Sequence, residues 1–95
     1  FCPLGPWIET ELDPSDQEVS CLVNGQVRQR GSTRDMVFDM KALLVYVTAV
    51  MTLEPGDILM TGTPSGVSPI TSGDELDVSV SGVGVLRNPV QFPTV

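Results

Sequence analysis

Apolar and polar residues alternate in two stretches of the chain, Glu18–Val23 and Glu75–Val80. This two-residue period is typical of strands with one buried face. Asn24-Gly25 follows the first stretch and favours a type I′ turn, so we expect residues 26–30 to return as the second strand of a hairpin. A glycine-rich turn after the second stretch predicts another return strand over residues 85–88. The residues expected to face inward are Val19, Cys21, Val23, Leu76, Val78 and Val80.

The spacing of apolar residues changes to a helical period in the middle of the chain. It predicts a helix over residues 39–51, with Asp35 or Thr33 as the candidate N-cap and Pro55-Gly56 beyond its end. Because several residues of this helix are β-branched, packing has to stabilise it, and we interpret its apolar stripe as core. The stripe consists of Met36, Met40, Leu43, Leu44, Val47 and Met51.

Three further segments are expected to be extended. Residues 7–10 could form a short strand, and the continuous apolar run 58–60 predicts a strand buried on both faces. Residues 89–95 are expected to form an extended terminal segment. The chain therefore fits one mainly β (α+β) domain at most, with five to seven short strands, one helix and open sheet edges. Such open edges and so small a core indicate a piece that completes a larger sheet.

Composition excludes several classes of function. Twelve acidic residues against five basic ones give a net charge of −7, which argues against nucleic acid or an anionic membrane as partner. No apolar run reaches the length of a membrane span. The chain has no histidine, so chemistry has to rest on carboxylates, lysine, hydroxyls or backbone groups. Cys2 and Cys21 are far apart, which favours free thiols in a reducing compartment and leaves a single disulfide open.

The most informative segment is MTGTPSG, residues 60–66. It supplies three hydroxyls, its two glycines permit close approach of a ligand, and Pro64 stiffens it. Such a loop can donate hydrogen bonds to a carboxylate or phosphate, or it can be a plain turn. The missing lysine of a phosphate-binding loop and the net charge disfavour phosphate. Arg28 and Arg30 could hold an anionic substrate or could simply lie on a solvated strand. A metal site formed within the chain is not expected.

Four phrases along the chain are informative together: FCPLGPWI, VNGQVRQRGSTRDMVFDM, TLEPGDILMTGTPSGV and SGDELDVSVSGVGVLRNPV. They span nearly the whole chain and resemble the C-terminal part of the catalytic domain of the fumarylacetoacetate hydrolase superfamily. The opening phrase and the hairpin that begins VNG resemble the subgroup of acylpyruvases and hydroxyhepta-dienedioate isomerases of aromatic catabolism. The resemblance implies a mixed β-roll and an enzyme that hydrolyses, decarboxylates or isomerises 2,4-dioxo or 2-hydroxy-dienoic acids. It also implies a Mg²⁺ (or Mn²⁺) ion that stabilises an enolate as a Lewis acid.

The resemblance also assigns roles to residues. Thr63 matches a threonine that contacts the substrate's carboxylate, Gly62, Pro64 and Ser65 shape the same loop, and Gln29 lines the site, as does the loop of residues 1–6. The family's metal ligands, a Glu-x-Glu pair and a later Asp, and a lysine before the phrase matched by Phe1-Cys2 have no match in this chain, which also does not begin with Met. We therefore expect a C-terminal portion without catalytic or metal-binding residues of its own.

The expected partners are a dicarboxylic or 2-oxo acid, the N-terminal portion that carries the metal ligands, and a second copy in a cytoplasmic homodimer. A non-catalytic β domain that serves dimerisation or scaffolding is the alternative.

Overall fold

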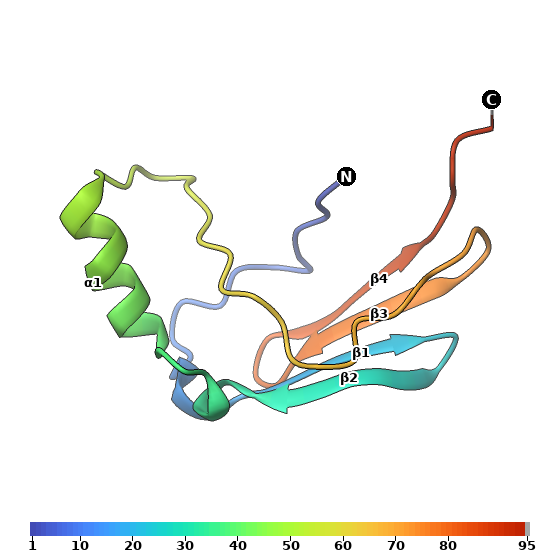
Figure 1. Ribbon diagram of the computed structural model, residues 1–95, viewed down its shortest axis with the longest axis horizontal. Coiled ribbons are helices and arrows are strands. Elements are labelled where there is room, and N and C mark those ends of the chain that lie inside the picture. The colour runs from blue at the N-terminus through green and yellow to red at the C-terminus, as the bar shows by residue number, and fades with distance from the viewer. Residues whose placement is uncertain (95) are drawn as a thin grey trace.

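The computed structural model describes residues 1–94, in which four strands form one antiparallel sheet in the order β2-β1-β3-β4 (Figure 1). A mainly β fold with one helix was expected from the sequence and is confirmed. The sheet has fewer strands than the five to seven predicted. The strands are β1 (Glu18–Val23), β2 (Gln26–Ser32), β3 (Glu75–Val80) and β4 (Gly84–Pro89).

The hairpin β1–β2 forms as the sequence predicts. Asn24 and Gly25 both have positive φ, 52° and 80°, as a type I′ turn requires. The pairing register shifts within the hairpin, from Cys21 opposite Gln29 to Leu22 opposite Val27. Arg28 is therefore the extra residue of a β-bulge, which bends the strand and re-aims its side chains. This bulge positions the candidate site described below.

Pairing of β1 with β3 brings residues more than 50 positions apart into register. Ser20 and Ser79 lie opposite each other, and their hydroxyls are 2.7 Å apart. On the neighbouring strand β4, Arg87 lies opposite Asp77 of β3 and donates two hydrogen bonds to its carboxylate, at 2.6 and 2.9 Å. Val23, 3% exposed, is the one buried apolar residue within residues 1–94, so the chain by itself encloses very little core.

The helix α1 (Met40–Val50) forms close to its predicted limits, but its cap and its packing differ from prediction. Asp39 is the N-cap, and its carboxylate accepts a 2.7 Å hydrogen bond from the Ala42 amide, whereas Asp35 and Thr33 belong to a preceding 3₁₀ turn. The helix projects away from the sheet (Figure 1), and none of its residues is buried. The expectation that its apolar stripe is core is therefore wrong within residues 1–94.

Two predicted strands are absent from the described chain. Residues 7–10 and 58–60 are irregular, and Ile58 and Met60 are 59% and 80% exposed rather than buried on both faces. A strand needs a neighbour for its backbone hydrogen bonds, and neither segment pairs with one of the four strands. The predicted inward face of β3 is also incomplete, because Val78 is exposed while Asp77 and Ser79 are partly buried.

Within residues 1–94 no helix has the length and apolar character that crossing a membrane requires. Both cysteine thiols, of Cys2 and Cys21, are free.

Candidate functional site

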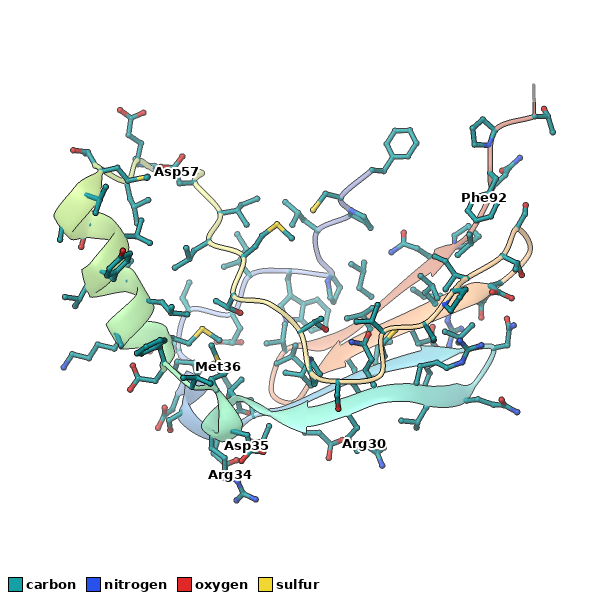
Figure 2. All side chains as sticks on the ribbon, in the orientation of Figure 1. Arg30, Arg34, Asp35, Met36, Asp57 and Phe92 are labelled. Carbon is teal, nitrogen blue, oxygen red and sulfur yellow. The ribbon has the colours of Figure 1, made fainter. Side chains whose placement is uncertain are left out.

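A cavity of about 580 Å³ lies where the sheet, the turn after β2, the start of α1 and the MTGTPSG loop come together. Gly62, Thr63 and Pro64, three of the residues predicted for the site, lie in its wall. Figure 2 shows Asp35 and Met36 at the turn between β2 and α1. The complete lining is Val19, Gly31, Thr33, Asp35, Met36, Val37, Phe38, Met40, Leu43, Thr61, Gly62, Thr63, Pro64 and Val80.

The loop is attached to β2 by side chains of that strand. Gln29 donates from its amide nitrogen to the Thr63 hydroxyl oxygen at 2.8 Å and to the Pro64 carbonyl oxygen at 2.7 Å. Arg28 donates to the Ser68 hydroxyl at 2.7 Å and to the Pro69 carbonyl at 3.3 Å. The segment from Thr63 to Pro69 therefore runs alongside β2, which holds the Thr63 end at the cavity.

The β-bulge explains how two consecutive residues reach the same loop. Side chains of neighbouring residues in a regular strand point to opposite faces. Because Arg28 is the extra residue of the bulge, both its side chain and that of Gln29 contact the loop.

Two glycines allow the loop to lie this close to β2. A Cβ on Gly31 would lie 3.0 Å from the Pro64 Cβ, and a Cβ on Gly66 would collide with the Arg28 carbonyl oxygen. Gly66 also has a φ of 109°, which side chains rarely adopt. One glycine of the loop, Gly66, and one of β2, Gly31, therefore permit the close approach of the two segments.

The segment that leads from the MTGTPSG loop to β3 is fixed by a carboxylate. Asp74 accepts hydrogen bonds from the Thr71 amide at 2.8 Å and from the Asn24 side-chain amide at 2.9 Å. These hydrogen bonds, with the Thr71 amide contributing most, hold the pKa of Asp74 below its ordinary value. Asp74 therefore stays ionised at neutral pH and ties the loop to the β1–β2 turn.

The remaining predicted site residues lie outside the cavity wall. Ser65 is exposed in the loop, and Gln29 reaches the wall only through its hydrogen bonds to Thr63 and Pro64. The loop of residues 1–6 packs elsewhere, since a Cβ on Gly84 of β4 would lie 3.3 Å from Pro6. Arg30 points away from the loop (Figure 2) and forms an exposed ion pair with Glu18 at 3.6 Å. Its direct role in holding an anion at this cavity has no support.

Sequence reasoning missed the contribution of the turn after β2. Thr33 is nearly buried, and its hydroxyl accepts a 2.8 Å hydrogen bond from the Gln17 amide. Asp35 and Phe38 add a carboxylate and an aromatic ring to the cavity wall. From the sequence this segment was expected only to supply the N-cap of the helix, through Asp35 or Thr33, and β2 runs to Ser32, two residues beyond its predicted end.

The residues present do not form a metal-binding set. No group of three or more His, Cys, Asp or Glu side chains that could hold a metal ion occurs within residues 1–94. Asp35 is the one carboxylate in the described cavity wall. The chemistry that this wall offers is hydrogen-bond donation from hydroxyls beside an apolar surface, which suits the carboxylate of a small organic acid.

The fold and the cavity together define a β domain with a candidate small-molecule site. The chain belongs to the fumarylacetoacetate (FAA) hydrolase C-terminal family, whose sequence model matches residues 1–91. This confirms the resemblance seen in the sequence.

Three relatives illustrate the range of the family. The crystal structure of 5-carboxymethyl-2-hydroxymuconate delta-isomerase from Mycobacterium smegmatis is 56% identical, with a TM-score of 0.92 over 95% of this chain and 36% of that protein. Maleylpyruvate hydrolase from Sphingobium sp. SYK-6, in complex with manganese(II) ion and pyruvate, is 42% identical, with a TM-score of 0.91 over 96% and 36%. The 4-hydroxyphenylacetate degradation bifunctional isomerase/decarboxylase of Salmonella dublin is 43% identical over 93% of this chain and 21% of its own length. The chain thus spans about a third or less of these relatives.

Proposed function

We propose that the protein carrying this chain is an enzyme that cleaves, decarboxylates or isomerises a 2,4-dioxo or 2-hydroxy-dienoic acid. The names of its relatives, an isomerase, a hydrolase and an isomerase/decarboxylase, support this class of reaction. The observation that carries the proposal to this chain is the position of Thr63, which lies in the cavity wall and is held there by Gln29.

In this proposal Thr63 donates a hydrogen bond to the carboxylate of the acid. Gly62 lets the loop turn beside the ligand without a side chain, and its φ of 88° suits glycine. Pro64 and Ser65 shape the loop. Apolar residues of the wall, such as Phe38 and Leu43, exclude water around the carbon chain of the bound acid.

A divalent ion, Mg²⁺ or Mn²⁺, is proposed for the intact protein because a relative was solved with manganese and pyruvate, a 2-oxo acid. Such an ion would supply Lewis-acid stabilisation of an enolate. The described residues do not fit this ion, so its ligands are proposed to lie in a preceding portion of the catalytic domain. This chain contributes the substrate-binding side of the site.

The exposed apolar surface also supports a catalytic domain that this chain forms together with a preceding portion. Large apolar side chains are exposed on α1 and on the segment after it, and burying them would be strongly favourable. We propose that the rest of the catalytic domain covers this surface and that the intact protein forms a homodimer. The residues concerned include Val45, Tyr46, Val50, Ile58 and Met60.

The test is Thr63→Val in the intact protein, assayed on acylpyruvates and oxaloacetate. Loss of a hydrogen bond to a charged group costs about 1.5–3 kcal/mol. We therefore expect KM to rise by about 10- to 150-fold. Binding of Mn²⁺, measured by calorimetry, is expected to stay unchanged. Thr63→Ser keeps the hydroxyl and serves as the matched control, with a KM close to that of the wild type.

The result separates the enzyme from the scaffold hypothesis. An unchanged KM for Thr63→Val would remove the proposed carboxylate contact. No turnover of either class of acid by the intact wild-type protein with Mg²⁺ or Mn²⁺ present would favour a non-catalytic domain.

A further inference from the structure

The orientation of the Gln29 side-chain amide is fixed by its two partners. A carbonyl oxygen only accepts hydrogen bonds, so the amide atom 2.7 Å from the Pro64 oxygen has to be the nitrogen. The same nitrogen lies 2.8 Å from the Thr63 hydroxyl oxygen. Both amide hydrogens of Gln29 are therefore used on the loop, one on each partner.

This arrangement determines what the Thr63 hydroxyl can do. Its oxygen accepts from Gln29, so its own hydrogen has to be donated to a different group. Thr63 lies in the cavity wall, where a ligand can supply that acceptor. A carboxylate offers only acceptors and can take the Thr63 hydrogen, whereas an ammonium group offers only donors and would leave that hydrogen without a partner.

Gln29 itself is not available to donate to a carboxylate, because both of its hydrogens are engaged. Its free amide oxygen is an acceptor and would be repelled by an anion. Gln29 is half-buried and lies on a strand beside a β-bulge, and such a site holds a side chain more rigidly than a free loop would.

We propose that Gln29 is a positioning residue that makes the Thr63 hydroxyl a dedicated donor and so selects ligands with an anionic acceptor at this point of the cavity. The proposal rests on the proposed carboxylate contact of Thr63. It changes the role of Gln29 from a direct substrate contact to one that acts through Thr63.

The test is a double-mutant cycle in the intact protein with the wild type, Gln29→Met, Thr63→Val and the double variant, assayed for KM and kcat on acylpyruvates. Gln29→Met removes both donors and keeps the side-chain length. We expect it to raise KM by about 3- to 30-fold with a smaller change in kcat, because an unoriented hydroxyl loses part of one hydrogen bond. In the Thr63→Val background the same change is expected to raise KM by less than about 2-fold.

Arg28→Ala is the matched control, because Arg28 holds the same loop through Ser68 and Pro69 without touching Thr63. Any effect of Arg28→Ala on KM is expected to be the same factor in both backgrounds. If Gln29→Met does not yield folded protein, Gln29→Leu takes its place, since it also has no hydrogen to donate and adds no charge beside the ligand's carboxylate.

The outcomes separate the two proposals. If Thr63→Val alone leaves KM unchanged, the carboxylate contact fails and the role of Gln29 fails with it. If Thr63→Val raises KM and Gln29→Met multiplies KM by the same factor in both backgrounds, only the role of Gln29 is overturned. Gln29 then supports the loop as Arg28 does. If KM of the Gln29 variant stays at the wild-type value, the proposal is likewise overturned.

Discussion

Gly66 is the position at which the loop and β2 approach most closely, so Gly66→Ala tests the geometry of the candidate site. The new methyl group would collide with the Arg28 carbonyl oxygen, a backbone atom that cannot rotate away. The loop would have to move by on the order of 1 Å to restore normal separation of carbon and oxygen. The Gln29 hydrogen bonds, now 2.7 and 2.8 Å long, would then exceed hydrogen-bonding distance.

The expected loss of stability has two parts. A side chain at a φ of 109° costs about 1–3 kcal/mol in backbone strain. The two broken hydrogen bonds add about 0.5–1.5 kcal/mol each. Gly73→Ala supplies a matched control, because Gly73 has a φ of 97° and nothing within 4 Å of an added methyl group. Gly66→Ala should therefore destabilise the protein by about 1–3 kcal/mol more than Gly73→Ala.

The assay is urea denaturation of the two variants and the wild type of the intact protein, with KM measured alongside. Stability follows from the midpoint when the slope is unchanged. KM of Gly66→Ala is expected to rise because Thr63 moves with the loop, and KM of Gly73→Ala is expected to stay near the wild-type value. Equal losses of stability in the two variants would refute the close contact between the loop and β2.

Two further predictions concern the helix cap and the sheet. Asp39→Ala removes the hydrogen bond from the Ala42 amide and should lower the free energy of unfolding by about 1 kcal/mol, measured by thermal denaturation. Asp35 lies outside the cap, so Asp35→Ala should have a smaller effect in the same assay. A larger effect of Asp35→Ala would contradict the cap assignment. The Arg87 hydrogen bonds lower the pKa of Asp77 in the folded protein. The pair therefore contributes its full stabilisation at pH values above the pKa of Asp77 in the unfolded chain, about 4, and loses it as the pH falls through the lower pKa of the folded protein. The difference in urea midpoint between wild type and Asp77→Asn should therefore be present at pH 7 and vanish at low pH; a difference that grows on acidification would contradict this sign.

Local signals in the sequence predicted most of the sheet correctly. Alternation identified β1 and β3, and Asn24-Gly25 identified the hairpin turn, because these depend on neighbouring residues alone. The apolar run at residues 58–60 failed as a strand, since strand formation depends on a pairing partner elsewhere in the chain or outside it. The apolar stripe of α1 failed as core for the same reason, because nothing within residues 1–94 buries it.

The sequence by itself determined the family and the loop. The phrase around Thr63 predicts a substrate-binding segment, which stays a prediction, whereas the match over residues 1–91 confirms the family. The sequence also predicts that the metal ligands lie outside this chain, and this stays a prediction.

Only the tertiary structure decided how the loop is held and which residues face the cavity. Gln29 and Thr63 are 34 residues apart, and their hydrogen bond exists because a β-bulge at Arg28 turns two adjacent side chains toward one loop. The turn at Thr33–Asp35 enters the cavity wall for a similar reason, since the path of the chain after β2 places it opposite the loop. Such contacts depend on the register and direction of distant segments, which local periodicity does not encode.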